Sequence, residues 1–296
     1  MQNHPKNREP QWTIRKVLNW TVSYFNSRDI ENPKSDAAIL LAHVLNLRRI
    51  DLFIQYDKPL NSDELAAFRS LIKRRVSREP IAYIVGKKGF WTLDLLVSED
   101  VLIPRPETEC LVEAALPVLP ESSSPKRILE LGTGTGAVIL SLARERPGNL
   151  FFASDRSVRA IKMARGNAKN YGLDKSVSFF CGDWFSALNN MQHFDIIVSN
   201  PPYIRTGDIE RLQPEINKYE PYMALDGGEN GFDSIEHIIR RAHAYLADHG
   251  NLLLEMGHDQ KNDVMEIIDK CACYDNVAVT KDYSGYDRVV RMRKKD

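Results

Sequence analysis

The feature that most limits how this chain can fold is a regular alternation of strand-like and helix-like segments after residue 125. The strand-like runs are RILEL near residue 127, LFFASD ending at Asp155, VSFFCGD ending at Asp183, FDIIVSN ending at Asn200 and NLLLEM near residue 254. Helical segments lie between them, a pattern that predicts parallel strands joined by helical crossovers. We therefore expect a doubly wound, Rossmann-like α/β sheet. The tail predicts two further strands around a turn at Gly285, added antiparallel at the sheet edge.

The first 80 residues have a different pattern, because apolar residues recur there every three or four positions in three segments. This spacing predicts a small all-helical domain in which Ser35 and Ser62 cap the second and third helices. The composition then changes to β-branched and aromatic residues around Gly86 and Gly89, which predicts a β-hairpin. The three predicted parts are a helical domain over 1–79, a β-hairpin linker over 80–103 and an α/β catalytic domain over 104–296.

Composition restricts the kinds of partner that we expect. The 296 residues include 40 basic and 40 acidic ones, so no overall charge attracts the chain to nucleic acid. The four cysteines form neither a CxxC pair nor a Cys/His cluster with metal-ligand spacing, so we expect reduced structural thiols and no metal site. No apolar run reaches about 18 residues, and the N-terminal residues do not resemble a signal peptide. We therefore expect a cytoplasmic protein that has no membrane contact.

A glycine-rich loop follows the first predicted strand, at the edge where an open α/β sheet binds its ligands. The loop residues are Gly132, Thr133, Gly134, Thr135 and Gly136. Positions without a side chain let the backbone turn sharply and approach a ligand closely. With Ala137 the loop completes a G-x-G-x-x-A pattern, so by itself it is equally compatible with a dinucleotide site. A merely tight strand-to-helix turn is a further interpretation.

The next two strand ends add candidate contacts to a nucleoside. Asp155 closes the second strand, where a carboxylate can accept both hydroxyl hydrogens of a ribose. NAD and S-adenosylmethionine share that ribose, and Asp155 could instead cap the following helix. Asp183 and Trp184 place an acceptor and a flat ring where an adenine could lie, although Trp184 could also be ordinary core packing.

The fourth strand end indicates the class of reaction. Asn200, Pro201, Pro202 and Tyr203 follow directly on an apolar strand. An amide or aromatic amine nitrogen is a poor nucleophile because its lone pair is delocalised, so a site that methylates it must orient it with hydrogen-bond acceptors. The Asn200 oxygen and a neighbouring carbonyl can accept two N–H groups, while the prolines fix the turn and add no competing donor. Tyr203 can stack on the planar group, although Asn-Pro is also common in ordinary turns.

Several segments resemble the bacterial release factor glutamine methyltransferase family, also called the HemK or PrmC family. The segments are residues 78–86, the IPRPETE loop within 101–109, NPPYI at 200–204, the YEP to ALDGGE stretch within 219–231 and SGYDRVV at 284–290. The chain departs from the family at two places. It has Phe90-Trp91-Thr92 where the family usually has an aromatic residue followed by glycine, and its first strand ends in Glu130 where the family more often has Asp. Both places lie outside the proposed substrate pocket. The resemblance runs from the helical domain to the last strand.

The resemblance implies a class I S-adenosylmethionine-dependent methyltransferase fold and a role for each matching residue. Residues 132–136, Asp155, Trp184 and Asn200 would bind S-adenosylmethionine, and Asn200 to Tyr203 would hold a substrate glutamine. The substrate would be the Gly-Gly-Gln (GGQ) loop of peptide chain release factors, giving N5-methylglutamine. The helical domain would recognise the factor, and the protein would be a monomer with no stable nucleic-acid partner.

Other functions remain open at this point. NPPY also occurs in adenine-N6 nucleic-acid methyltransferases and in glutamine methyltransferases that act on a ribosomal protein. The even charge and the lack of an evident basic stripe disfavour the nucleic-acid enzyme. A non-catalytic binding protein would show damaged ligand loops, whereas all four strand ends are intact. An oxidoreductase would account for the glycine loop and Asp155 but gives no role to NPPY.

Overall fold

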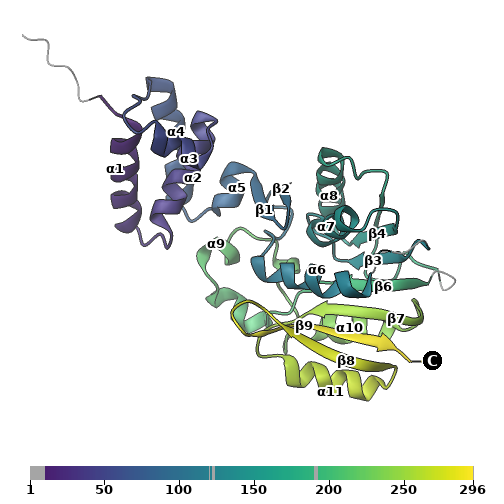
Figure 1. The fold of residues 1–296 in the computed structure, drawn as a ribbon. Helices are drawn as coiled ribbons and strands as arrows, with labels where there is room; N and C mark the ends of the chain where they lie inside the picture. The colour runs from purple at the N-terminus through teal and green to yellow at the C-terminus, as the bar shows by residue number, and fades with distance from the viewer. Residues whose placement is uncertain (1–10, 120, 122–123, 190–192, 296) are drawn as a thin grey trace, which may run out of the picture. The chain divides into compact units, whose positions relative to one another are not determined.

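A computed structural model describes residues 11–119, 121, 124–189 and 193–295 (Figure 1). The chain divides between Gly86 and Lys87 into two compact units. Within the described residues, no helix is long and apolar enough to cross a membrane.

The first unit is helical, as its periodicity predicts. Its helices are α1 (Ile14–Asn26), α2 (Pro33–Leu45), α3 (Arg49–Ile54), α4 (Ser62–Val76) and α5 (Ile81–Val85). Phe25, Leu41 and Phe68 lie at the centre of its core, where burial of aromatic and aliphatic side chains stabilises the unit. The sequence did not predict α3, because a helix of 6 residues is too short to show a helical period.

The expected helix caps were wrong. Ser35 lies inside α2, which begins at Pro33 because proline is favoured at the first helical position. Ser62 is the first residue of α4, and its cap is Asn61. The Asn61 side chain accepts from the Glu64 N–H at 2.8 Å while the Glu64 carboxylate accepts from the Asn61 N–H at 2.8 Å. This reciprocal capping box satisfies two donors and therefore outcompetes the serine.

The hairpin begins later than the sequence predicts. Residues that we expected to be extended form α5, which ends at Val85. Gly86 follows it with a φ of 72°, a left-handed conformation that suits glycine after a helix. The hairpin itself consists of β1 (Lys87–Phe90) and β2 (Leu93–Leu96), which pair antiparallel. The segment 80–103 is therefore part helix and part hairpin, and the hairpin belongs to the second compact unit.

The hairpin packs into the core of the second unit. Phe90, Leu93 and Leu95 are buried there. The Asn167 side chain accepts from the Leu96 N–H at 2.8 Å and donates to the carbonyl oxygens of Leu96 at 3.1 Å and Thr135 at 2.9 Å. One buried amide thus connects the hairpin to the glycine-rich loop.

The second unit contains a seven-stranded sheet in the order β5-β4-β3-β6-β7-β9-β8. Its strands are β3 (Arg127–Leu131), β4 (Leu150–Asp155), β5 (Val177–Cys181), β6 (Phe194–Ser199), β7 (Leu246–Glu255), β8 (Tyr274–Lys281) and β9 (Asp287–Lys294). The pairs from β5 to β7 are parallel, and β9 is antiparallel to both β7 and β8. This arrangement confirms the predicted doubly wound fold with an antiparallel addition at its edge.

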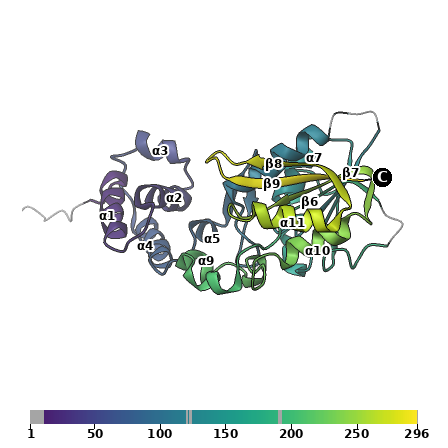
Figure 2. The same ribbon diagram turned by 90° about the horizontal axis from the view of Figure 1, so that it is seen from below.

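Helices cover both faces of this sheet. α6 (Glu109–Ala115), α7 (Ala137–Glu145) and α8 (Val158–Asn170) pack on one face. α10 (Asp233–Ala242) and α11 (Lys261–Cys271) pack on the other, the face that Figure 2 presents. Neighbouring strand residues alternate between the two cores, as Ile196 and Ile197 do, so the central strands are apolar throughout.

Candidate active site

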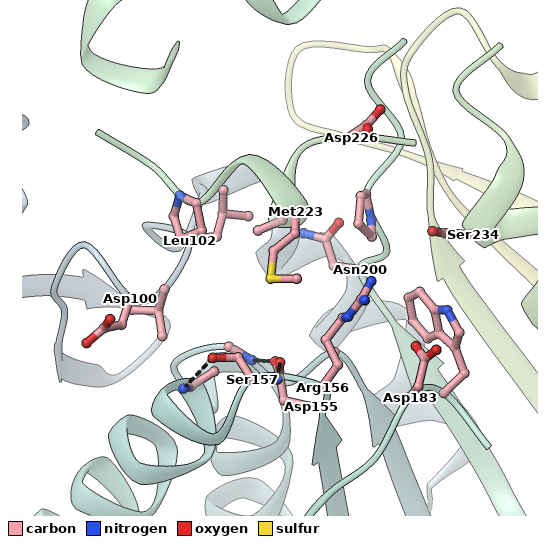
Figure 3. A pocket seen from close by; sticks show the side chains of 18 of the residues that line it. Asp100, Leu102, Asp155, Arg156, Ser157, Asp183, Asn200, Met223, Asp226 and Ser234 are labelled. Carbon is pink, nitrogen blue, oxygen red and sulfur yellow. Dashed lines mark hydrogen bonds between the residues drawn. The ribbon is translucent and has the colours of Figure 1, made fainter. Parts of the chain in front are cut away.

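A cavity of about 890 Å³, its mouth included, lies at the carboxyl ends of β3, β4, β5 and β6. Figure 3 shows Asp155, Ser157 and Asp183 along one side of the pocket and Met223 and Asp226 along the other. Along the sheet, the chain order of the strands changes direction between β3 and β6. An open α/β sheet binds its ligands at such a point, outside the carboxyl ends of the strands.

The glycine-rich loop contributes two glycines to the cavity wall. Gly132 and Gly134 line it with φ angles of 71° and 54°, a backbone region that other residues adopt at a steric cost. Thr133, Thr135 and Gly136 are buried and do not belong to the wall. They shape the loop, so the structure brings only part of the predicted set to the cavity.

Glu130, at the end of β3, organises this loop from below. It is 3% exposed, and its carboxylate accepts a hydrogen bond from the Thr133 hydroxyl and another from the Ile139 N–H at 3.3 Å. Burial raises the pKa of Glu130 to about 8, which these two hydrogen bonds oppose. Its role is to hold the loop, and it is not part of the cavity wall.

Asp155 lines the cavity at the end of β4. One carboxylate oxygen accepts from the Gly134 N–H at 2.9 Å and the other from the Ser157 N–H at 2.9 Å. Each oxygen keeps a further lone pair that can accept a ligand hydroxyl hydrogen. Ser157, not Asp155, caps α8, since its hydroxyl accepts from the Ala160 N–H at 3.2 Å. The alternative role of Asp155 as a helix cap is therefore wrong.

Trp184 lines the same cavity after β5, which ends at Cys181, earlier than predicted. Its φ of 49° is uncommon for a large side chain, and such backbone strain concentrates at functional sites. The ring is partly buried and packs against the sheet core on one side, so Trp184 both packs and faces the cavity. Asp183 lies beside it on the wall.

The cavity wall carries an excess of negative charge. Four aspartates, Asp100, Asp155, Asp183 and Asp226, line it together with one arginine, Arg156. A wall of this kind attracts a cationic ligand and repels a polyanionic one. The cavity is therefore better suited to a sulfonium or ammonium compound than to the diphosphate of a dinucleotide.

A second cavity, of about 460 Å³, adjoins the first at the NPPY segment. All four predicted catalytic residues, Asn200, Pro201, Pro202 and Tyr203, line it. Asn200 and Pro202 line both cavities, together with Leu102 and Ala224. A ligand in the first cavity and a side chain in the second would therefore meet at Asn200.

The orientation of the Asn200 amide depends on the IPRPETE loop. Asn200 Nδ2 donates a hydrogen bond to Thr108 Oγ1 at 3.0 Å. Thr108 ends the short η1 turn (Pro106–Thr108) and is buried, with 5% of its surface exposed. Because Nδ2 is engaged in this way, Oδ1 remains as the acceptor that Asn200 can offer to a substrate.

Tyr203 is held by a buried carboxyl that the sequence analysis did not single out. Its hydroxyl donates to Glu255 Oε1 at 3.2 Å, and Glu255, at the end of β7, is 1% exposed. Burial raises the pKa of Glu255 to about 7, although the nearby Thr108 side chain and the charge of Arg288 oppose the rise. Burial, followed by the nearby Glu255 charge, also raises the pKa of Tyr203, so this phenol stays protonated.

Gln260 holds the backbone of NPPY and was also missed. Its Nε2 donates to the carbonyl oxygens of Tyr203 at 2.9 Å and Gly231 at 3.2 Å, and its Oε1 accepts from the Gly257 N–H at 2.8 Å. A Cβ atom on Gly227 would lie 2.8 Å from the Tyr203 Cα atom, so the ALDGGE stretch packs directly on NPPY. A buried glutamine with all its groups paired fixes a loop more firmly than apolar packing does.

Glu220 joins two segments that flank NPPY in the sequence, the IPRPETE loop and the YEP to ALDGGE stretch. This carboxylate is 5% exposed, accepts from the Ile103 N–H at 3.1 Å and forms an ion pair with Arg105. Burial raises the pKa of Glu220, and the Arg105 charge opposes the rise. The pair fixes the IPRPETE loop against the segment before η4 (Tyr222–Ala224), and both Arg105 and Ala224 line the second cavity.

One cluster outside the site was invisible in the sequence spacing. The ligand atoms of His243, Cys271 and Cys273 lie within 4.8 Å of one another. Both thiols donate to backbone carbonyls, Cys271 to Ile239 at 3.9 Å and Cys273 to Cys271 at 3.2 Å. The Cys271 contact joins the end of α11 to α10, and the three ligand atoms lie close enough together to hold one metal ion, a grouping that the sequence spacing did not predict.

Comparison with known proteins assigns both units. A family model described as the PrmC N-terminal domain matches residues 16–86, and one described as the methyltransferase small domain matches residues 108–214. The solved structure of a methyltransferase from Pyrococcus furiosus is similar in fold, with a TM-score of 0.53 and 19% identity, covering 80% of this chain and 100% of that one. This structural likeness supports the fold alone.

Relatives of known name match almost the whole chain. A release factor glutamine methyltransferase of Geobacter sulfurreducens is 42% identical over 285 residues, which cover 95% of this chain and 97% of that protein. One of Coxiella burnetii is 42% identical over 264 residues, with 89% and 93% covered. With both family models and near full-length relatives in agreement, the chain belongs to the release factor glutamine methyltransferase family.

Proposed function

We propose that this chain transfers a methyl group from S-adenosylmethionine to the side-chain amide nitrogen of the glutamine in the GGQ loop of peptide chain release factors. The observation that carries the proposal is the pair of cavities that meet at Asn200 and Pro202. A methyl donor in the larger cavity and a glutamine side chain in the smaller one would have their reacting atoms at this junction. Family membership supports the choice of substrate.

The residues of the larger cavity fit S-adenosylmethionine. Asp155 offers free lone pairs to ribose hydroxyls, Asp183 and Trp184 suit an adenine, and Gly132 and Gly134 allow close approach of the backbone. The four aspartates of the wall complement a ligand that carries a sulfonium and an ammonium group. When bound, this cofactor supplies an electrophilic methyl group.

The residues of the smaller cavity would prepare the glutamine for attack. Asn200 Oδ1 and a backbone carbonyl of NPPY accept the two N–H groups, which aligns the nitrogen and favours the positive charge that it develops. Pro201 and Pro202 present no N–H group that would compete for these acceptors. Tyr203 packs against the planar amide, and one N–H proton is lost to solvent once the new N–C bond has formed.

The other parts of the chain have proposed roles as well. The helical part predicted over 1–79 would recognise the release factor, the segment 80–103 would link it to the catalytic part, and 104–296 would carry the chemistry. A translation factor as substrate places the reaction in the cytoplasm. We expect the enzyme to act as a monomer that binds no nucleic acid stably.

The test is transfer of labelled methyl from S-adenosylmethionine to a purified release factor. Parallel reactions contain the same factor with its Gly-Gly-Gln changed to Gly-Gly-Ala, purified ribosomal proteins, or duplex DNA. Label on the unaltered factor alone supports both the substrate and the target residue. Label on a ribosomal protein or on DNA, or equal label on the Gly-Gly-Ala factor, refutes the assignment while leaving the methyltransferase fold in place.

A further inference from the structure

The orientation of the Asn200 amide is a choice between two states that differ by a half-turn. One state presents an oxygen acceptor to the substrate, and the other presents two N–H donors that would repel the N–H groups of a glutamine amide. In this structure Asn200 Nδ2 donates to Thr108 Oγ1 at 3.0 Å. A hydroxyl that accepts a hydrogen bond still carries one hydrogen of its own, so the Thr108 hydrogen needs an acceptor elsewhere.

Glu255 is the group that can take this hydrogen. It is 1% exposed, and its Oε1 accepts from the Tyr203 hydroxyl at 3.2 Å. Its Oε2 is buried and has no hydrogen-bond partner among the residues that the structure describes. The Thr108 side chain is near enough to this carboxyl to oppose the rise of its pKa. A buried carboxylate oxygen without a partner is costly, and the Thr108 hydroxyl is the donor at hand.

We propose that Glu255 is a positioning residue for the reaction: its carboxylate accepts the Thr108 hydroxyl hydrogen, which turns the Thr108 oxygen toward Asn200 Nδ2 and presents Asn200 Oδ1 to the substrate amide. The same carboxylate holds Tyr203 through its other oxygen. One buried group at the end of β7 thus fixes both ends of NPPY. The inference rests on the proposed function, because it explains how that site prefers an amide N–H donor.

The relay needs the ionised form of Glu255. Two hydroxyl donors, from Thr108 and Tyr203, require two accepting oxygens, and a proton on the carboxyl would compete for one of them. The other charged or titratable groups facing Glu255 are Arg288 on β9, Glu107 on η1 and Cys110 on α6. Arg288 favours the ionised carboxylate and Glu107 opposes it. Acidification is expected to switch off the positioning without removing any side chain from the site.

The experiment compares four single variants with the unaltered protein. Glu255→Gln keeps the shape but replaces one acceptor by an N–H₂ donor, Thr108→Val removes the hydroxyl, and Thr108→Ser restores it. Tyr274→Phe is the matched control, because it also removes a buried hydroxyl, which donates to the Ile239 carbonyl at 2.7 Å outside both cavities. Each protein is assayed for kcat and KM with a release factor from pH 5.5 to 9, and for S-adenosylmethionine binding.

We expect Glu255→Gln and Thr108→Val each to lower kcat about ten- to a hundredfold, the kinetic equivalent of one hydrogen bond to a charged group. Cofactor affinity should change less than about twofold, since neither residue lines the larger cavity. Thr108→Ser and Tyr274→Phe should retain most activity. The double variant should be no slower than either single variant, because both changes break one relay. The acid limb of the kcat profile should disappear in Glu255→Gln.

A second readout does not depend on turnover. In ¹⁵N-labelled protein, the Asn200 side-chain amide should show one downfield-shifted, slowly exchanging proton that is lost in Glu255→Gln and Thr108→Val but kept in Tyr274→Phe. Unchanged amide signals in the two variants would overturn the relay, as would full kcat or additive losses in the double variant. A protein that modifies no release factor would instead refute the proposed function, and the amide signals would still decide whether Glu255 orients Asn200.

Discussion

Glu255→Gln should make the protein more stable above neutral pH while it makes the enzyme slower. The carboxyl lies fully inside the second unit, and burial raises its pKa from 4.5 to about 7. A difference of about 2.5 pKa units corresponds to roughly 3 kcal/mol between the folded and unfolded chains. The native protein therefore keeps a charge at this position at a cost in stability.

The sign of the pH dependence follows from the raised pKa. An unfolded chain releases this proton near pH 4.5, whereas the folded one retains it to about pH 7. The free energy of unfolding should fall by roughly 3 kcal/mol as pH rises through that window. Glutamine does not ionise, so the variant lacks this decrease. Loss of the hydrogen bond that we propose from Thr108 to this charged group costs roughly 2 kcal/mol, which leaves a net gain of about 1 kcal/mol above pH 7.

Urea unfolding followed by far-ultraviolet circular dichroism at pH 5, 6, 7 and 8 measures the effect. The buried Glu130, whose pKa is raised to about 8, adds a similar slope to both proteins and cancels in the comparison. In a separate thermal unfolding experiment at pH 8, the variant should melt about 2–4 °C higher. Identical pH slopes, or a variant that is less stable at pH 8, would refute the reasoning that Glu255 is buried for orientation at the expense of stability.

Three further predictions concern the two cavities and their support. Asn200→Ala should lower kcat by about 10²–10³ while the chain keeps its fold and most of its affinity for S-adenosylmethionine, since Asp155 and the glycine-rich loop remain, and a fully active variant in the methyl-transfer assay would remove Asn200 from the mechanism. Asp155→Ala should weaken S-adenosylmethionine binding about ten- to a hundredfold in calorimetry, since it removes ribose acceptors and releases the Gly134 N–H; unchanged affinity would contradict the assignment. Gly227→Ala should destabilise the protein by about 1–3 kcal/mol and lower kcat, because its Cβ would lie 2.8 Å from the Tyr203 Cα atom. Gly207→Ala is the control, as a Cβ there meets nothing within 4 Å, and equal effects at both positions would disprove the packing argument.

The alternation of segments and the residues at strand ends made the fold and much of the site predictable. Strand ends in a parallel sheet lie at one edge, so Gly132, Asp155, Trp184 and Asn200 were expected to come together, and all four line one cavity. Helix starts were less predictable, because Asn61 with Glu64 outcompetes Ser62 for the cap through a reciprocal pair that a single residue does not reveal.

The contacts that the sequence analysis missed share one property: they join residues that are far apart along the chain. Thr108 meets Asn200, Tyr203 meets Glu255, and Gln260 meets Gly231. None of these pairs has a local spacing that a helix or strand period could reveal. His243 joins Cys271 and Cys273 for the same reason, as the ends of α10 and α11 approach only in the folded unit.

The sequence by itself determined the class of fold, the cavity edge and the chemical type of the reaction, because periodicity and strand-end residues are local properties. The tertiary structure decided which loop residues face the cavity, placed β9 between β7 and β8, and directed the Asn200 amide through Thr108. Hydrogen-bond direction depends on which donors and acceptors meet in three dimensions. For that reason, Glu255 could be related to NPPY only once β7 and β6 lay side by side in the sheet.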